Sequence, residues 1–335
     1  MVKKSTNKLL CVVITFVCTI LYNTNNTAYT QDPEFSQFYA NPIYLNPALA
    51  GTHGCPRFNI NYRNQWPSLS GTFVTYSASY DQYINAMNGG IGVLITQDVA
   101  GKGTLNTTTA SLIYSYHLTV TRKFSILMGA QATWNQKFLD WNKLTFGDQI
   151  DPRRGFIYQT GDVPRNVNDN NMGTRGFFDV SAGIVGYTDI FYFGFAAKHL
   201  NMPNESLIIG DSRMPMRFTA HAGANIALGQ KSKYTNQTTI SPNVLWTFQQ
   251  GFMQTNIGLY IKYGVVTGGV WWREGDAFIT TVGVDLGTFR LGYSYDVTVS
   301  KLTNASGGSH EISLGINLNC RKKPKRFRTI SCPSF

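Results

Sequence analysis

Charged residues are scarce in this chain, and long apolar runs are absent after its first 30 residues. Asp, Glu, Lys and Arg make up 14% of the 335 residues, against about 25% in a typical soluble protein. No segment after residue 30 approaches the roughly 18 consecutive apolar residues of a membrane-spanning helix. With 13% aromatic residues and 32 glycines, the composition fits a protein with a large uncharged surface. If such a chain crosses a bilayer, it crosses as a closed barrel of strands.

The spacings that gather catalytic or metal-binding side chains are also missing. The sequence has no HExxH, GxSxG or CxxC pattern, and its five histidines are scattered. AGKGT at residues 100–104 lacks the first glycine of a GxxxxGK phosphate loop and is interpreted as a turn. His310 beside Glu311 could be imagined in a barrel enzyme, but a lone histidine near a strand end is more often an interfacial or hydrogen-bonded residue. We therefore predict no enzyme activity, no metal and no cofactor.

The first 30 residues have the order of a secretory signal. Three lysines precede the apolar run LLCVVITFVCTILY at residues 9–22, and a polar stretch containing Ala28 and Thr30 follows before a plausible cut at Gln31. The run has 14 residues, fewer than the roughly 20 that a spanning helix needs. This length disfavours the alternative, an uncleaved N-terminal anchor. We predict residues 1–30 to be the signal peptide of an exported protein.

Apolar and polar residues alternate in segments of strand length. In HEISLGINLN (310–319) and TFRLGYSYDV (288–297), apolar residues occupy one face and mainly small or polar residues occupy the other. In MRFTAHAGANIAL (216–228), the face expected to point inward carries Arg217, Thr219, His221, Gly223 and Asn225. A soluble sandwich would show the same period. The scarcity of charge and the aromatic residues near strand ends favour lipid on the outside.

Turn signals divide residues 57–319 into an all-β, transmembrane antiparallel barrel of about fourteen strands, and an even number is typical of bacterial barrels. The predicted strands are residues 57–67, 72–83, 89–97, 104–118, 124–139, 176–187, 190–199, 215–228, 238–249, 251–262, 265–273, 277–286, 288–298 and 309–319. With a periplasmic N-terminus, every second connection should be short. The longest predicted connections, 140–175, 200–214 and 299–308, all belong to the other set. A loop as long as 140–175 is usually functional or disordered, so we expect a partner contact or a fold into the lumen, with a floppy surface loop as the alternative.

A set of compositionally unusual stretches covers the whole mature chain. They are QDPEFSQF (31–38), YLNPALAG (44–51), NYRNQWP (61–67), GGIGVLITQDVAGKG (89–103), YSYHL (114–118), DWNKLTFGDQIDPR (140–153), SAGI (181–184), FYFGFAAKHL (191–200), SPN (241–243), GYSYD (292–296), HEISLGI (310–316) and CRKKPKRFRTISCPSF (320–335). In these stretches the chain resembles the PorP/SprF family of outer-membrane proteins, which is associated with type IX secretion and gliding motility in Bacteroidetes.

The resemblance implies an integral outer-membrane barrel that is not itself a catalyst and supports surface delivery of proteins with a type IX C-terminal signal domain. The implied partners are components of the secretion apparatus on the periplasmic side, the C-terminal domain of a secreted adhesin, and outer-membrane lipid. The family supplies no catalytic residues to transfer. The alternative function is a porin or small-molecule transporter, because about fourteen strands can enclose a lumen.

The basic excess lies in the C-terminal tail, residues 320–335. RKKPKRFR within it carries six positive charges, whereas the body of the mature chain is nearly neutral. In an exported protein this favours a solvated tail or an anionic partner at the membrane over a nucleic acid. The candidate partner-binding residues are Arg321, Lys322, Lys323, Lys325, Arg326 and Arg328.

Three cysteines remain after removal of the signal: Cys55, Cys320 and Cys332. They allow one disulfide and one leftover thiol. A bridge between Cys320 and Cys332 would close the tail into a loop and is slightly favoured, because a turn at Pro324 shortens the span. A bridge from Cys55 to Cys320 would instead clasp the seam between the first and last strands. Either one needs the two Cα atoms within about 7 Å.

Residues 31–56, between the signal and the first strand, have neither a helical nor a strand pattern. Pro33, Pro42 and Pro47 exclude a regular helix or a central strand. The segment is nevertheless too apolar for a free linker. We predict that it starts on the periplasmic side and packs, as an ordered segment, against the periplasmic rim or inside the lumen, with plugging favoured over partner binding. The candidate plug residues are Phe35, Phe38, Tyr39, Tyr44 and Leu45.

Overall fold

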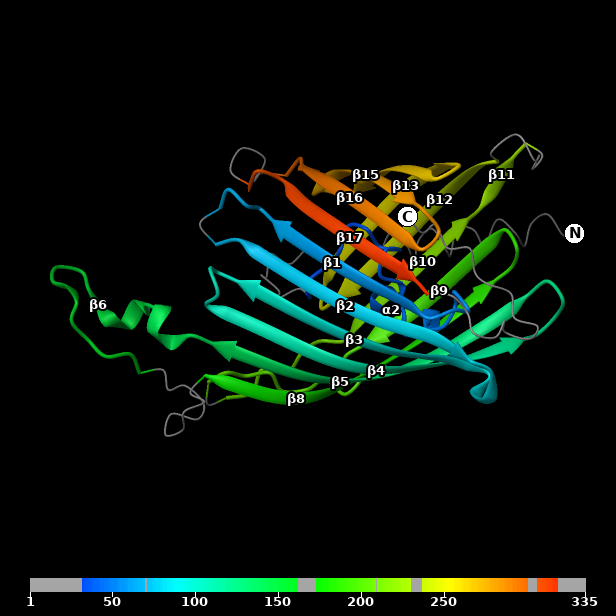
Figure 1. Ribbon diagram of the computed structural model, residues 1–335. Helices are drawn as coiled ribbons and strands as arrows, with labels where there is room; N and C mark the ends of the chain where they lie inside the picture. Colours follow the sequence, from blue (N-terminus) through cyan, green and yellow to red (C-terminus); the bar gives the residue numbers. More distant parts are fainter. Residues whose placement is uncertain are drawn as a thin grey trace, which may run out of the picture.

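Fourteen antiparallel strands close into a barrel (Figure 1). The computed structural model describes residues 32–69, 71–161, 173–208, 210–229, 237–300 and 306–318. The ring is closed by pairing of β1 (Arg57–Gln65) with β17 (Ser309–Asn317). Between them come β2 (Phe73–Ile84), β3 (Gly89–Ala100), β4 (Leu105–Thr119), β5 (Ser125–Leu139), β8 (Thr174–Tyr187), β9 (Phe191–Lys198), β10 (Arg217–Ala224), β11 (Ile226–Leu228), β12 (Thr238–Gln249), β13 (Phe252–Tyr263), β14 (Val266–Arg273), β15 (Ala277–Asp285) and β16 (Phe289–Thr298). The predicted barrel and its strand count are confirmed. No helix in the described ranges is long and apolar enough to span a membrane.

One barrel strand is interrupted, because β10 and β11 are two parts of the strand predicted over residues 215–228. Both parts pair with β12 in one register. In that register the break at Asn225 lies opposite Ser241, and the residue just before the break lies opposite Pro242. Proline has no N–H to donate to the ladder. The Ser241 hydroxyl donates instead to the Asn225 side-chain oxygen, at 2.7 Å. The missing backbone donor therefore explains why the strand is split.

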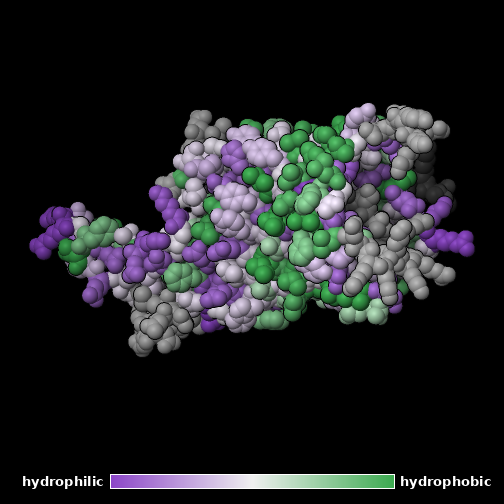
Figure 2. Space-filling view, viewed as in Figure 1, coloured by the Kyte–Doolittle hydropathy of each residue, from purple (hydrophilic) through white to green (hydrophobic). Residues whose placement is uncertain are grey.

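The two faces of the wall differ as the alternation predicts. On β16, Arg290 and Asp296 face inward and are buried, whereas Leu291 and Val297 face outward with 51% and 43% of their surface exposed. A soluble sandwich would bury its apolar face. Figure 2 shows apolar side chains gathered in a band over the barrel wall. This distribution assigns the apolar face to lipid.

The two ends of the barrel differ in their connections. At one end, called the short-turn end, lie the connections 85–88, 120–124, 188–190, 229–237, 264–265 and 286–288. At the other, the long-loop end, lie the three long connections 140–173, 199–216 and 299–308. Long loops of bacterial outer-membrane barrels face the outside and short turns face the periplasm. The predicted alternation of short and long connections agrees with the fold.

Short helical turns complete the structure. Two of them, α2 (Pro42–Leu45) and η1 (Pro47–Leu49), lie inside the barrel and belong to residues 32–56, called here the luminal segment (Figure 1). The others are η2 (Asn85–Met87), η3 (Trp141–Lys143) and η4 (Gly147–Gln149). Strands β6 (Ile150–Asp151) and β7 (Gly155–Phe156) form a small hairpin that projects beyond the long-loop end.

Candidate functional site: the occupied lumen

The luminal segment runs along the interior of the barrel from one end to the other. Asp32, its first residue, contacts His199, which directly follows β9 at the long-loop end. Gly51 donates its N–H to the carboxylate of Asp81 at 2.9 Å, and Asp81 is paired with Arg57 at the short-turn end. The sequence predicted a start on the periplasmic side. Asp32 lies instead at the opposite end of the lumen, because the buried cations that neutralise the first acidic residues are there.

The first ionic cluster holds the start of the luminal segment at the long-loop end. Arg217, the first residue of β10, forms an ion pair with Glu34, and its Nη1 lies 3.6 Å from Asp32 Oδ2. His199 bridges two carboxylates, with Nε2 2.8 Å from Asp32 and Nδ1 3.0 Å from Asp179. Burial alone would lower the pKa of His199, but Asp32 and Asp179 raise it to about 9. Burial favours a higher pKa for Asp32, yet His199 and Arg217 hold it far below its usual range. The charged forms of His199, Asp32 and Arg217 therefore stabilise one another.

A second ionic cluster surrounds Ser36, which is fully buried. Its N–H donates to Glu311 of β17 at 2.6 Å, and its hydroxyl donates to Asp296 of β16 at 2.5 Å. Arg63 of β1 and Arg273 of β14 lie 3.1 and 3.2 Å from the same Asp296 carboxylate. Buried charges need partners, since leaving one unpaired costs several kcal/mol. The luminal segment thus ties together four strands, including the two at the barrel seam.

Aromatic side chains fill the lumen between the clusters and the short-turn end. Phe38 packs edge-on against Trp271, with ring centroids 4.9 Å apart. Tyr39 contacts the rings of Tyr192 and Tyr260. Of the candidate plug residues, four are buried and Tyr44 is partly buried. The Tyr44 hydroxyl donates to the Pro33 carbonyl, and burial raises its pKa.

The barrel wall is shaped to the luminal segment at η1. A Cβ added to Gly129 of β5 would lie 2.3 Å from the Ala48 nitrogen, and one added to Gly90 of β3 would lie 2.1 Å from the Ala50 oxygen. Neither distance is compatible with a side chain at the glycine. The Ser115 hydroxyl of β4 donates to the Ala48 carbonyl at 2.7 Å. Small wall residues therefore let the backbone of the segment lie directly against the sheet.

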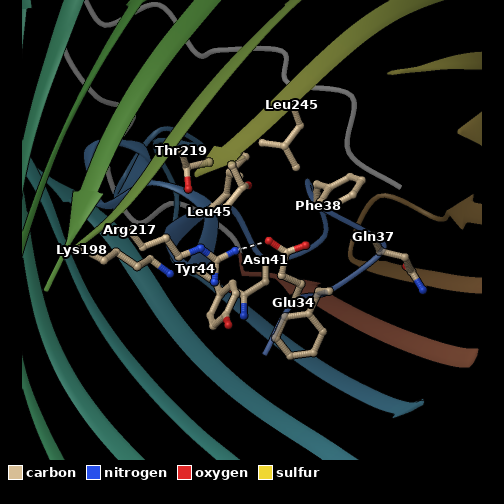
Figure 3. Close-up of a pocket in the computed structure, with 12 residues that line it drawn as sticks. Glu34, Gln37, Phe38, Asn41, Tyr44, Leu45, Lys198, Arg217, Thr219 and Leu245 are labelled. Carbon is tan, nitrogen blue, oxygen red and sulfur yellow. Dashed lines mark hydrogen bonds and ion pairs between the residues drawn. The ribbon is translucent and has the colours of Figure 1, made fainter. Parts of the chain in front are cut away.

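The cavity beside Arg217 is small. It has a volume of about 30 Å³ and lies between the luminal segment and the wall, lined by Glu34, Phe38, Tyr44, Lys198 and Arg217, among others. This volume holds only one or two water molecules. Figure 3 shows Arg217 extending from the wall to Glu34, with Lys198 and Tyr44 beside it. No group of three His, Cys, Asp or Glu side chains suited to a metal ion occurs in the part of the chain that the structure describes.

The remaining predicted sites lie mostly outside the described residues. These are Cys320, Cys332 and the tail cations Arg321, Lys322, Lys323, Lys325, Arg326 and Arg328. Cys55 is described and is disulfide-bonded, with its partner outside the described residues. The charged wall residues Arg63 and Arg273 were not among the predicted site residues, and Glu311 was considered only as a neighbour of His310. A sequence pattern could have indicated them, because they are charged residues on the inward face of strands in a chain with little charge. Charged side chains in that position require a partner in the lumen.

Several solved structures are similar to the chain at low sequence identity. The chain is similar to the toluene transporter TbuX of Ralstonia pickettii, with 12% identity, 83% of this chain and 93% of that chain covered, and a TM-score of 0.45. For the outer membrane protein Omp33 of Acinetobacter baumannii the identity is 9%, the coverage 79% and 100%, and the TM-score 0.42. For the toluene transporter TodX of P. putida the identity is 11%, the alignment covers 82% of this chain and 93% of that chain, and the TM-score is 0.45. At these values the solved structures support no argument about function. No curated protein matches the chain.

The family model described as type IX secretion system membrane protein PorP/SprF matches residues 27–316. That match spans the luminal segment and nearly the whole barrel. The chain therefore belongs to the PorP/SprF family and is an integral outer-membrane protein of the type IX secretion system.

Proposed function

We propose that this barrel supports secretion and surface anchoring of proteins that bear a type IX C-terminal signal domain, including adhesins used in gliding motility, without itself being a catalyst. Family membership supports a place in the secretion system. The occupied lumen is the observation that supports an anchoring role for the barrel rather than a channel. With its interior filled by its own residues 32–56, the barrel offers its two ends and its outer wall for function.

The two ends would have different partners. The periplasmic, short-turn end and the basic tail would contact components of the apparatus. The long-loop end, which faces the outside, would hold the exported protein. In this role the luminal segment acts as a plug that keeps the outer membrane sealed while cargo is held at the surface.

The porin alternative requires an open path through the lumen. The luminal segment reaches from His199 at one end of the lumen to Asp81 at the other, so on this proposal it would have to leave for solutes to pass along the lumen. Planar-bilayer recording tests this point: the full-length barrel should show no steady conductance. A steady conductance from the intact protein, together with uptake that does not depend on cargo, would favour the porin.

Deletion of the gene tests the secretion role. Surface display of at least one protein with a type IX signal domain should be lost, and should return when the full-length barrel is restored. Restoration with a chain that lacks residues 321–335 should rescue display poorly, although the barrel folds and reaches the membrane. If every such protein is displayed normally without this barrel, the proposal is wrong. If the truncated chain rescues display as fully as the full-length chain does, the tail has no role in secretion.

A further inference from the structure

A groove runs along β10 on the outer face of the barrel wall. Its floor consists of the outward-facing alanines of this strand, which are Ala220, Ala222 and Ala224. In the antiparallel register these alanines lie opposite large residues of both neighbouring strands. On β9 the large residues are Phe191, Phe193 and Phe195, and on β12 they are Pro242, Val244 and Trp246. The wall thus carries a row of small side chains between two rows of large ones.

The groove is open because the ring of Phe193 leans away from it. A Cβ added to Gly186 of β8 would lie 2.5 Å from Phe193 Cζ, so the ring covers this glycine on the side away from β10. The ring also stacks against Phe124, with ring centroids 6.4 Å apart. The space left between Phe193 and Val244, over the alanine floor, measures about 500 Å³. A space of this size is in the range of small-molecule sites.

The side chains that face the groove are apolar. Two polar residues also line it, Tyr192 and Asn243, but their side chains point into the lumen. There the Tyr192 hydroxyl donates to the side-chain oxygen of Asn243. A polar ligand would lose its hydrogen bonds to water in this groove without replacement. The occupant is therefore apolar along its length.

The width of the groove selects a thin occupant. Neighbouring strands lie about 4.8 Å apart, so the backbones of β9 and β12 are separated by about 10 Å. The side chains that stand on these two strands narrow the opening further. An α-helix with its side chains is about 10–12 Å across and does not fit between the two rows. A single hydrocarbon chain does fit.

The groove lies in the half of the wall nearest the short turns. Phe191 directly follows the connection 188–190, and the floor from Ala224 to Ala220 is about 14 Å long. With strands tilted by about 40°, this length covers about 10 Å of bilayer depth, which is less than one leaflet of about 15 Å. Because the short-turn end faces the periplasm, that leaflet is the periplasmic one, which consists of phospholipid.

We propose that this groove binds one acyl chain of a phospholipid from the periplasmic leaflet and holds that lipid more tightly than the rest of the wall holds its neighbours. The inference goes beyond the proposed function and does not depend on it. The groove adjoins Asn225, where the backbone pairing of this wall strand is interrupted, so the bound chain covers the wall beside the break. The competing occupants are the acyl anchor of a lipoprotein and an apolar segment of another membrane protein.

The probe is a phosphatidylethanolamine with a photoreactive diazirine in its acyl chain. It is mixed into vesicles of phosphatidylethanolamine and phosphatidylglycerol that hold the full-length barrel, and labelled peptides are mapped after irradiation. Native mass spectrometry of the barrel in detergent then measures how many phosphatidylethanolamine molecules are retained and how tightly. The filled variant is Ala222→Leu, and the widened variant is Phe193→Ala. Matched controls are Ala132→Leu on β5 and Phe278→Ala on β15, which alter exposed outward residues elsewhere on the wall.

Labelling should concentrate in residues 191–195 and 242–246, and one lipid should be retained per barrel. The filled variant should lower the affinity about tenfold or more, and the widened variant should also weaken it, because each loses apolar contact with the chain. The controls should stay within about twofold of the wild type. Heat-modifiable migration on gels verifies that every variant is a folded barrel.

Three results would overturn the proposal. The first is equal labelling of all outward faces of the barrel, which would indicate ordinary contact with bulk lipid. The second is equal retention of lipid by Ala222→Leu and Ala132→Leu. The third is a photo-cross-linker at position 244 that captures, in living cells, a lipoprotein or another membrane protein in place of phospholipid.

Discussion

His199 Nε2 lies 2.8 Å from the Asp32 carboxylate, although the two residues are 167 positions apart in the chain. The contact fixes the start of the luminal segment at the end of the barrel that faces outside. The same imidazole holds Asp179 through its other nitrogen. One histidine therefore joins the segment to β8 and to the loop after β9.

This contact should make the luminal segment sensitive to alkaline pH. The pKa of His199 is raised from 6.5 to about 9, so its stabilisation is fully present below about pH 6.5 and is lost as the pH rises through about 9. Hydrogen exchange of residues 32–36 should speed up over that range. In Asp32→Asn the segment should open more readily already at neutral pH, by about 1–3 kcal/mol, and the alkaline response should shrink. An equal response in both proteins would rule out this contact as its source.

Loss of Glu311 should destabilise the whole barrel. Glu311→Ala removes the acceptor of the Ser36 N–H and leaves Arg63 with one carboxylate partner fewer. Breaking a buried pair costs about 3–5 kcal/mol, which urea unfolding followed by tryptophan fluorescence can measure. The neighbouring Ile312 faces outward, so Ile312→Leu serves as the control and should change the free energy of unfolding little. Similar losses in both variants would contradict the cluster's importance.

A methyl group at Gly129 should displace η1 from the wall. The added Cβ of Gly129→Ala would lie 2.3 Å from the Ala48 nitrogen, and such overpacking costs about 1–3 kcal/mol. Limited proteolysis should then cut within residues 46–52 in the folded barrel. Gly268→Ala, where nothing lies within 4 Å of the new Cβ, is the matched control. The close fit would be refuted by equal resistance of both variants.

The disulfide partner of Cys55 should be Cys320 rather than Cys332. Cys55 is disulfide-bonded, and the Leu318 N–H donates to the Pro56 carbonyl at 2.9 Å, which brings the start of β1 next to the end of β17. Peptide mapping without reduction should recover one peptide pair containing both cysteines. Recovery of a peptide pair joining Cys320 to Cys332 would instead support the tail loop favoured from the sequence alone.

The fold could be predicted because its signals are local. Alternation with period two and turn residues between strands give the strand positions, and the lack of charge identifies the lipid-facing side. The break at Asn225 was missed because it depends on Pro242, on another strand. The aromatic and proline content of residues 32–56 indicated an ordered segment. Its direction could not be predicted, because only contacts between distant residues such as Asp32 and His199 fix it.

The position of Ser36 has a consequence for how the barrel is assembled. Ser36 contacts Arg63 on the first strand and Glu311 on the last, the two strands whose pairing closes the ring. Because the segment is continuous with β1, the contacts of Ser36 couple the filling of the lumen to the pairing that closes the ring. We therefore expect the barrel and its luminal segment to form and to unfold as one cooperative unit.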